Sequence, residues 1–437
     1  ENRRIFSNVH ASFKFSILTL DGPSCSRNNY TRFIFFAHST SEIYDSNRYF
    51  ILSAEDFALF NPNTKTCPVF RSRRDAEITK GIYRRVPVLI NEAQCVNLWG
   101  VSFMLMFMMN TDSKRFHDSQ SDTVTTPVAS NGGAVNINGI TVNLYGAIGE
   151  DNGASVDKHR TAVGINDAIV NVNEVAVDIN DATVDENEVA VGKNAGTVVS
   201  NQTRVPLYEA KMLHHFNHRW ATYDGADTRD ASLQERQNPN YTVTPRYWVD
   251  ANDVESRLTK YDRTGNILWQ WEREWLLGWR DICRNTDFRT VIASLLPRVG
   301  VGNNFPIMFP TNDSAIATAC LIASLSSFAL DFVARQSVGG THLNYFIYKQ
   351  LPVLPPETYK DTWAEWIASR VLELVYTAWD MEPFALDCGY TGEPFVWNVE
   401  RRFLLRCELD AALSVSYTHL RAHETKANLV CRLLLEK

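Results

Sequence analysis

The stretch that decides the fold is residues 335–356, which read RQSVGGTHLNYFIYKQLPVLPP. The sequence predicts a long apolar helix leading into it, a helix end at Gly339-Gly340, a strand, and a proline-rich exit into another helix. Polar donors stand in this otherwise apolar run at Arg335, Thr341, His342, Asn344, Lys349 and Gln350. Such donors on a rigid scaffold could read a polar surface such as a DNA groove.

The segments on either side of this stretch have helical periodicity. Residues 313–335 carry apolar side chains at helical spacing (Ile316, Cys320, Leu321, Leu325, Phe328 and Phe332). This spacing predicts one core helix, which Asn312, Asp313 or Ser314 can cap. Beyond Pro356, an amphipathic helix is predicted along residues 357–382, and Pro383 is expected to end it.

The first 118 residues are predicted to be rich in strands. Residues 13–20 and 31–38 are β-branched and aromatic runs separated by turn residues, and 99–116 reads as a strand leaving into a polar loop. Between them we expect a short helix from Ser72 to about Arg84.

Residues 133–202 form a tandem repeat with a period of seven, as in TAVGIND, AIVNVNE and VAVDIND. A coiled coil is disfavoured because Val and Ala adjoin each other and Asn fills one position of nearly every repeat. We predict a flexible or loosely β-like surface insert, with a stacked β-solenoid as the alternative.

Composition excludes a strong global charge outside the repeat. The formal net charge is −7, but the repeat holds ten acidic and three basic residues, which leaves forty of each sign elsewhere. DNA binding would therefore depend on clustered bases. The most apolar run, residues 96–109, is shorter than the roughly 20 residues of a membrane span. Eight cysteines without metal-ligand spacing suggest a reducing cytoplasm.

Two further segments offer polar side chains. A helix predicted from residue 207 to 218 would group Lys211, His214, His215 and His218, and we favour polar contact with DNA or a domain junction over a metal site there. Residues 269–310 contribute Arg280, Arg284, Arg289 and Arg298. The planar arginine fork suits phosphate and guanine, although the nearby acids and tryptophans would also fit a packed surface.

Several runs carry a resemblance to a known family: NPNT…CP.FR…RDAEITK.IY.RVP with the segment 99–116, PLYEAKMLHHFNHRWATYDG, PRYWVD, GWRDI..NTD.RT.IAS.LPR.GVGN, GGTHLNYF…KQLPVLPP and GYTGEPFVWNVERRFLLRCELDAAL. They resemble the target-recognition region of adenine-specific DNA methyltransferases of bifunctional type II restriction–modification systems and of related phage-defence methylases. The resemblance covers residues 1–118 and 204–413 and implies a cytoplasmic module that binds double-stranded DNA. The predicted DNA contacts are Arg280, Arg284, Arg289, Arg335, Thr341, His342, Asn344 and Lys349, followed by Lys211 and His214.

The motifs of adenine methylation are not found. The reaction needs a Gly-rich cofactor turn and an Asn/Asp-Pro-Pro-Tyr/Phe loop for the flipped base. Residues 238–241 read NPNY without the second proline, and residues 300–302 are too short for a nucleotide loop. We predict no catalytic, cofactor or metal residues here, and expect an upstream catalytic domain of the same chain to use S-adenosylmethionine and optionally Mg.

These observations predict an α+β chain: a mixed β-sheet target-recognition domain with flanking long helices and a heptapeptide-repeat insert. The expected parts are 1–118 (β-rich), 119–203 (acidic repeat), 204–356 (recognition core) and 357–415 (helical). Residues 416–437 resemble translated sequencing adapter, and the protein is expected to be a fragment. One alternative is a non-catalytic DNA-binding or assembly subunit of a phage-defence system, and another is a surface protein organised on the repeat.

Overall fold

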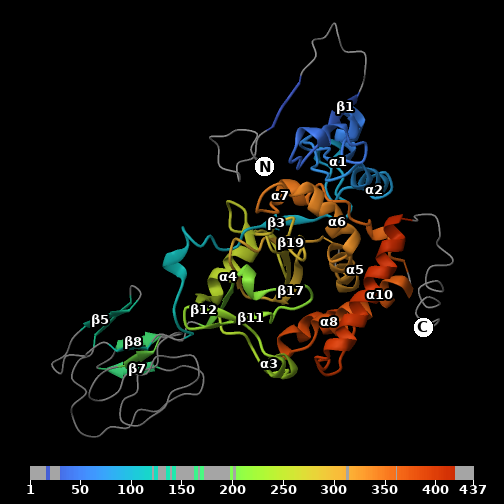
Figure 1. Cartoon of the computed structure of the whole chain (residues 1–437). Helices are drawn as coiled ribbons and strands as arrows, with labels where there is room; N and C mark the ends of the chain where they lie inside the picture. Colours follow the sequence, from blue (N-terminus) through green and yellow to red (C-terminus); the bar gives the residue numbers. More distant parts are fainter. Residues whose placement is uncertain are drawn as a thin grey trace. The chain divides into compact units, whose positions relative to one another are not determined.

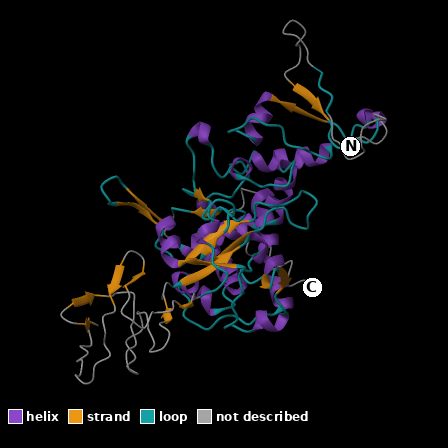
Figure 2. Cartoon of the chain, turned by 90° about the vertical axis from the view of Figure 1, so that its left-hand side faces the viewer, coloured by secondary structure: helices purple, strands orange, loops and turns teal. Residues whose placement is uncertain are grey.

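The computed structural model describes residues 16–19, 30–120, 123–125, 134–137, 140–143, 162–165, 168–171, 197–199, 203–311, 314–360 and 362–418. The chain divides into unit 1 (Glu1–Thr111, Tyr208–Pro245 and Thr259–Lys437) and unit 2 (Asp112–Leu207 and Arg246–Leu258). Helices and several small antiparallel sheets occur together (Figure 2), so the fold belongs to the α+β class.

The centre of unit 1 is a four-stranded sheet in the order β17-β16-β19-β3. Its strands are β3 (Ser102–Met104), β16 (Trp275–Trp279), β17 (Ala293–Pro297) and β19 (Ile307–Phe309), and every neighbouring pair is antiparallel. The predicted mixed sheet is therefore wrong for this sheet. All five residues of β16 are buried, because this strand lies inside the sheet and is covered by aromatic side chains.

Three helices pack against one another beside this sheet (Figure 1): α5 (Ala315–Leu325), α8 (Thr362–Val375) and α10 (Val399–Thr418). Helix α5 also contacts β17, and nine of its eleven residues are buried. Helix α6 (Phe328–Ser337) packs on α10. A buried helix needs no polar face, which explains why α5 is apolar nearly all round.

The part of unit 1 that precedes β3 holds a hairpin and two helices. Strands β1 (Tyr30–Phe33) and β2 (Phe50–Ser53) pair antiparallel, followed by α1 (Ala54–Phe60) and α2 (Arg73–Tyr83). The predicted helix from Ser72 is confirmed, since the Ser72 side chain accepts a hydrogen bond from the amide of Asp75 and caps α2. Within residues 30–118, more residues belong to helices than to strands. The predicted strand-rich character is therefore wrong for this part of the chain.

Residues 349–354 tie this part to the rest of unit 1. The amides of Leu89 and Ile90 donate to the carbonyls of Leu351 and Lys349, both at 2.9 Å. The Tyr83 hydroxyl donates to the Gln350 carbonyl at 2.8 Å. Residues 349–354 are thus a structural junction within unit 1.

The remaining elements of unit 1 are short. They are β11 (Ala221–Asp224) with β12 (Asp227–Asp230), β14 (Thr259–Tyr261) with β15 (Ile267–Gln270), β18 (Gly300–Val301), α3 (Leu233–Gln237), α7 (Tyr345–Tyr348) and α9 (Glu382–Asp387). The first two pairs are antiparallel.

Unit 2 contains strand β13 (Tyr247–Asp250), helix α4 (Ala251–Leu258) and most of β10 (Arg204–Tyr208), which pairs antiparallel with β13. In the described part of the repeat, β5 (Ala134–Ile137) pairs with β6 (Ile140–Asn143), and β7 (Ala162–Ile165) with β8 (Ala168–Asn171). Strand β4 (Thr123–Thr125) pairs with β9 (Thr197–Val199). Most of the repeat lies outside the described residues, so its predicted character stays a prediction.

Four predicted elements differ from the structure. The single helix predicted along 313–335 is two helices bent by 57°, because Ser327 is extended and caps α6. The strand predicted after Gly340 is instead turn and helix α7. The helix after Pro356 stops at Val375, and Pro383 opens α9 in the first turn, where proline is tolerated.

The fourth difference concerns residues 207–218, which do not form a helix. Strand β10 ends at Tyr208, a 3-10 turn covers Ala210–Met212, and His214 and Asn217 then exchange two backbone hydrogen bonds. Phe216 has a φ of +52° inside this tight turn, a conformation that a helix cannot contain.

At the far end, the packed chain continues past residue 415. Ser416 and Tyr417 belong to α10 and are buried, and the Tyr417 hydroxyl contacts the Ser324 hydroxyl and the Pro352 carbonyl, both at 3.0 Å. The predicted boundary at 415 therefore does not coincide with the end of the core. Among the described residues no single helix is long and apolar enough to cross a bilayer, and only the bent pair α5–α6 has the length and composition.

The crowding around Gly278 gives a first prediction. A Cβ on this β16 residue would overlap the Phe305 ring and the Pro306 carbonyl. We expect Gly278→Ala to lower the free energy of unfolding by about 2 kcal/mol, as overpacking of a core does. Urea unfolding of the full chain checks this. Gly339→Ala is the matched control, because its Cβ meets open space, and equal losses in both variants would contradict the packing argument.

Candidate nucleic-acid interface

Three of the predicted contact residues, Arg280, Arg284 and Arg289, belong to one loop between β16 and β17, residues 280–292, which we call the β16–β17 loop. The amide of Arg280 donates to the carbonyl of Ile292 at 2.9 Å, so the strand pairing continues into the base of the loop. Near its tip, the Asp287 carboxylate accepts from the Arg284 amide at 2.8 Å, and the Asp287 amide donates back to the Arg284 carbonyl at 3.1 Å. These bonds close a tight turn.

Helix α6 clamps this loop through Asp331 and Arg335. One carboxylate oxygen of Asp331 accepts from the amides of Thr290 and Val291 at 2.7 and 2.9 Å, and the other accepts from Arg335 Nε at 3.0 Å. The Arg335 guanidinium also donates to the loop carbonyls of Asn285, Asp287 and Phe288, at 3.2, 2.7 and 2.6 Å. The donors of Arg335 hold this loop in place, and its predicted contact with DNA stays a prediction.

The clamped loop presents Arg284 and Phe288 to solvent. Phe288 is 87% exposed, which is unusual for a large apolar side chain in a loop whose backbone is so firmly held. Arg284 is exposed, and its guanidinium has no partner among the residues that the structure describes. A positioned cation and an aromatic ring on a rigid loop form a surface suited to nucleic acid.

The other edge of the loop pairs with the segment after Gly340. The amide of Cys283 donates to the Thr341 carbonyl at 3.0 Å, and that of Leu343 to the Asp281 carbonyl at 2.7 Å. The His342 ring contacts the Asp281 carboxylate at 2.6 Å and stays half exposed. Two motifs about sixty residues apart in sequence are therefore adjacent in space.

Thr341, His342 and Asn344 line a pocket of about 530 Å³, together with Cys67 and Phe346 among others. The Asn344 side-chain oxygen is buried and has no hydrogen-bond partner within the described residues. These three predicted residues thus lie together, beside the β16–β17 loop.

Two predicted lysines are engaged in local contacts. Lys349 forms an ion pair with Glu92 at 2.7 Å. Lys211 is exposed, lies 3.9 Å from the Glu209 carboxylate and stands over the Tyr223 ring at 4.5 Å. Neither lysine lines the two pockets described here.

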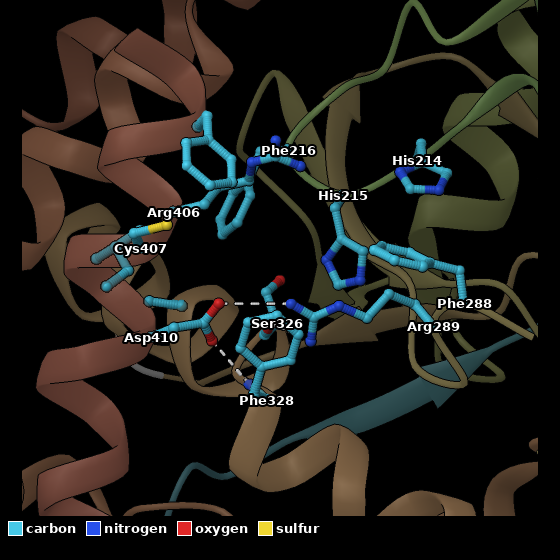
Figure 3. A pocket seen from close by; sticks show the side chains of 13 residues that line it. His214, His215, Phe216, Phe288, Arg289, Ser326, Phe328, Arg406, Cys407 and Asp410 are labelled. Atoms are coloured by element: carbon cyan, nitrogen blue, oxygen red, sulfur yellow. Dashed lines mark hydrogen bonds and ion pairs between the residues drawn. The ribbon is translucent and has the colours of Figure 1, made fainter. Parts of the chain in front are cut away.

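Arg289 and His214 line a second pocket, of about 120 Å³, which we call the arginine–aromatic pocket (Figure 3). Arg289 stacks on Phe328 at 3.8 Å and reaches the Asp410 carboxylate at 3.5 Å. Burial lowers the pKa of Arg289, and Asp410 opposes this shift. His214 stacks on Trp220 at 4.3 Å.

Both histidines at this pocket are held neutral. Burial, aided by the positive charge of Arg280 and of other arginines, lowers the pKa of His214 to about 4. Burial, with Arg289 next in importance, places the pKa of His215 well below 6.5. Arg280 itself is half-buried, burial lowers its pKa, and its Nε is without a partner in the described part of the chain.

The sequence predicts a helix that would group Lys211, His214, His215 and His218. The turn at 214–217 replaces this helix and separates His218 from His214 and His215. His218 is buried and bonded to the Asp380 carboxylate at 2.8 Å, while His214 and His215 line the arginine–aromatic pocket. Within the described residues, no group of three or more His, Cys, Asp or Glu could hold a metal ion.

Sequence reasoning missed the aromatic residues Phe288, Phe328 and Phe403 and the cation Arg406, all of which line the arginine–aromatic pocket. Phe288 alone left a signal, as an apolar residue in the polar run NTDFRT. Comparison with protein-family models found no matching family, and comparison with curated proteins found no similar sequence.

Proposed function

We propose that this chain is the sequence-reading part of a site-specific adenine-N6 DNA methyltransferase or restriction–modification enzyme. The observation that carries the proposal is the β16–β17 loop, which Asp331 and Arg335 fix from behind while Arg284 and Phe288 face solvent. A rigid loop loses little conformational entropy on binding, so its side chains can discriminate between bases. The sequence runs that resemble target-recognition regions support the same function.

In this proposal the parts of the surface have different roles. Arg284 offers an unpaired planar fork for two acceptors of guanine or for a phosphate. Thr341, His342 and Asn344 offer short polar groups next to it, suited to base edges. Arg335 and Asp331 act only by positioning the loop. Catalysis, with S-adenosylmethionine as methyl donor, is assigned to another domain of the enzyme.

The experiment is a selection of bound duplexes from a random DNA library with the full chain, followed by a salt titration. We expect one short sequence to be enriched and affinity to fall as salt rises, because phosphate contacts release counterions. Salt-dependent binding without enrichment would favour an assembly subunit instead. A folded chain that binds no duplex at low salt would contradict the proposal.

Arg284→Ala gives the sharpest single-residue prediction for this function. If Arg284 reads a base, the variant should lose about 1–3 kcal/mol of binding free energy and relax specificity at one position of the site. If it contacts phosphate, binding should weaken for all sequences and the salt slope should fall by about one. Binding titrations on the selected duplex and on single-base variants separate the two outcomes.

Arg74→Ala is the matched control, because Arg74 is an exposed arginine on α2. We expect it to bind like the wild-type protein. Equal affinity of the Arg284→Ala variant and the wild-type protein for every duplex would remove the β16–β17 loop from the interface.

A further inference from the structure

The arginine–aromatic pocket combines exposed aromatic walls with a buried histidine nitrogen that has no partner in the described part of the chain. A protein that contacts only the outer surface of a duplex needs neither feature. The pocket lies where the 214–217 turn, the β16–β17 loop, the start of α6 and the middle of α10 meet. Figure 3 shows the His215 ring extending toward the Arg289 guanidinium, with Phe328 below and Arg406 on the opposite side. Its volume of about 120 Å³ is of the order of the about 150 Å³ cavity that accommodates benzene.

The walls of this pocket are aromatic rings that the fold leaves uncovered. Phe288, Phe328 and Phe403 all line it, and they are 87%, 53% and 58% exposed. They come from the loop, the first residue of α6 and the helix α10, so no single local pattern explains why three exposed phenylalanines meet. Exposed aromatic rings around one cavity provide stacking surfaces for a planar ligand.

Inside the pocket, His215 offers a buried hydrogen-bonding atom without a partner among the described residues. This side chain is 7% exposed, and its Nε2 is buried with no partner in the described part of the chain. A neutral imidazole carries its proton on one ring nitrogen and a lone pair on the other. With the proton on Nδ1, the unpartnered Nε2 presents its lone pair to the pocket and accepts a hydrogen bond. A buried acceptor of this kind favours a ligand with an N–H donor.

Two arginines complete the pocket with donors. Arg289 is fixed by Asp410, by the Ser326 carbonyl at 3.3 Å and by stacking on Phe328. Arg406 is exposed, and its Nε donates to the Arg402 carbonyl at 3.3 Å. Its terminal nitrogens have no hydrogen-bond partner among the described residues and can donate to a ligand. The pocket therefore suits a heteroaromatic ring that carries both hydrogen-bond donors and acceptors. The donors of such a ring would face His215, its acceptors would face the two arginines, and its faces would pack against the phenylalanine rings.

We propose that the arginine–aromatic pocket binds a nucleobase that carries an amino group, with the amine donating to His215 Nε2 and the ring packed against the exposed phenylalanines. The base comes either from a nucleotide unstacked from DNA or from a free nucleotide. This inference deepens the proposed function, on which it rests only for the DNA source. A free nucleotide can fill the pocket of a protein that binds no duplex, so the two proposals fail separately.

The first experiment measures binding of deoxyadenosine monophosphate to the full chain by saturation-transfer NMR. The comparison ligand is purine deoxyribonucleoside monophosphate, which lacks the 6-amino group. We expect the wild-type protein to bind the amino-bearing nucleotide about tenfold more tightly, the effect of one hydrogen bond to a buried acceptor. Equal binding of both nucleotides, or none at millimolar concentration, would overturn the proposal.

Two variants connect this preference with His215. His215→Leu removes the acceptor and should abolish the preference for the amine. His215→Gln places an amide oxygen near the position of Nε2 and should restore part of it. A role in folding alone would not distinguish between the two ligands, and the thermal unfolding midpoint of each variant verifies that it is folded.

A second pair of variants avoids the buried histidine altogether. Phe403→Ala should weaken binding of the nucleotide, because it removes one wall of the pocket. Its neighbour Leu404 is 50% exposed and does not line the pocket, so Leu404→Ala is the matched control and should bind normally. Equal binding by the two variants would place the nucleotide outside the pocket and overturn the assignment.

A third measurement distinguishes the two sources of the base. Duplexes with 2-aminopurine at successive positions are titrated with the full chain, since this amino-bearing base gains fluorescence when it leaves the stack. A rise at one position that His215→Leu removes, at unchanged duplex affinity, identifies an unstacked DNA base. No rise at any position, with binding of the free nucleotide retained, identifies a free nucleotide as the ligand.

Discussion

Arg219→Ala should lower the free energy of unfolding of unit 1 by about 3–5 kcal/mol, the cost of removing one partner from a buried charged network. Arg219 is 0% exposed, and its two terminal nitrogens make five hydrogen bonds. The accepting carbonyls belong to Asn238, Tyr241, Arg236 and Thr377, at 2.8–3.0 Å.

The size of this effect follows from what alanine would leave behind. Three of the four carbonyls belong to the end of α3 and the segment that follows it, and the fourth, that of Thr377, follows α8, so the guanidinium joins two parts of the chain that lie far apart in sequence. Each buried acceptor left without a donor costs about 1–3 kcal/mol. Asp380, which lies close to both Arg219 and His218, would also lose a neighbouring positive charge.

Urea or thermal unfolding of the full chain measures this loss. Arg219→Lys keeps the charge but offers one compact ammonium instead of a planar fork, so it should recover only part of the lost stability. The matched control is Arg229→Ala, which removes an exposed arginine paired with Glu235 and should leave the midpoint close to that of the wild-type protein. Equal losses for Arg219→Ala and Arg229→Ala would contradict the network argument.

Local patterns in the sequence predicted those elements that local interactions determine. Helix α2 begins directly after Ser72, the residue that the sequence predicts as its N-cap. In α5, Cys320, Leu321 and Leu325 are buried, as their helical spacing predicts. The break between α5 and α6 was missed because apolar residues continue at helical spacing to Phe328, while Ser327 caps a new helix. As a result, Phe328 lies at the pocket with 53% of its surface exposed instead of in the core.

The sequence predicts which segments supply polar residues to the candidate interface. It does not predict which of these residues are free to bind a ligand and which are held by other residues of the chain. Arginines of the segment 278–303 and donors after Gly340 do lie side by side, joined by backbone bonds between Cys283 and Thr341. Arg335 and Lys349 look like free cations in the sequence, yet their partners are the carbonyls of residues 285–288 and Glu92. Such pairings join positions far apart in the chain, so a single sequence cannot reveal which cations remain available.

The histidines at the arginine–aromatic pocket predict a strong loss of stability in mild acid. In the unfolded chain both titrate near 6.5, whereas the folded protein lowers the pKa of His214 to about 4 and that of His215 well below 6.5. As the pH falls below 6.5, the unfolded state therefore binds protons that the folded state does not. Stability is fully present above 6.5 and is lost toward the folded pKa values.

The expected loss is about 2 kcal/mol for each histidine between about pH 7 and pH 5. Most charged groups around the two histidines lower the pKa of the rings further, as burial does. They are arginines, which disfavour a further positive charge: Arg280, Arg289, Arg236 and Arg406. Asp410 acts against it, since burial raises its pKa and the folded state then gains relative stability as the carboxyl takes up a proton. The net result remains a fall in the free energy of unfolding on acidification.

Urea unfolding of the wild-type chain at several pH values between about 7 and 5 measures this slope. His214→Gln and His215→Gln should each remove about half of the contribution of the pair, and the double variant should remove all of it, because glutamine does not titrate. A double variant with the wild-type slope would show that other groups cause the acid sensitivity. A wild-type chain that gains stability over this range would contradict the neutral, desolvated state of both rings, and with it the bare acceptor on His215 that the nucleobase proposal requires.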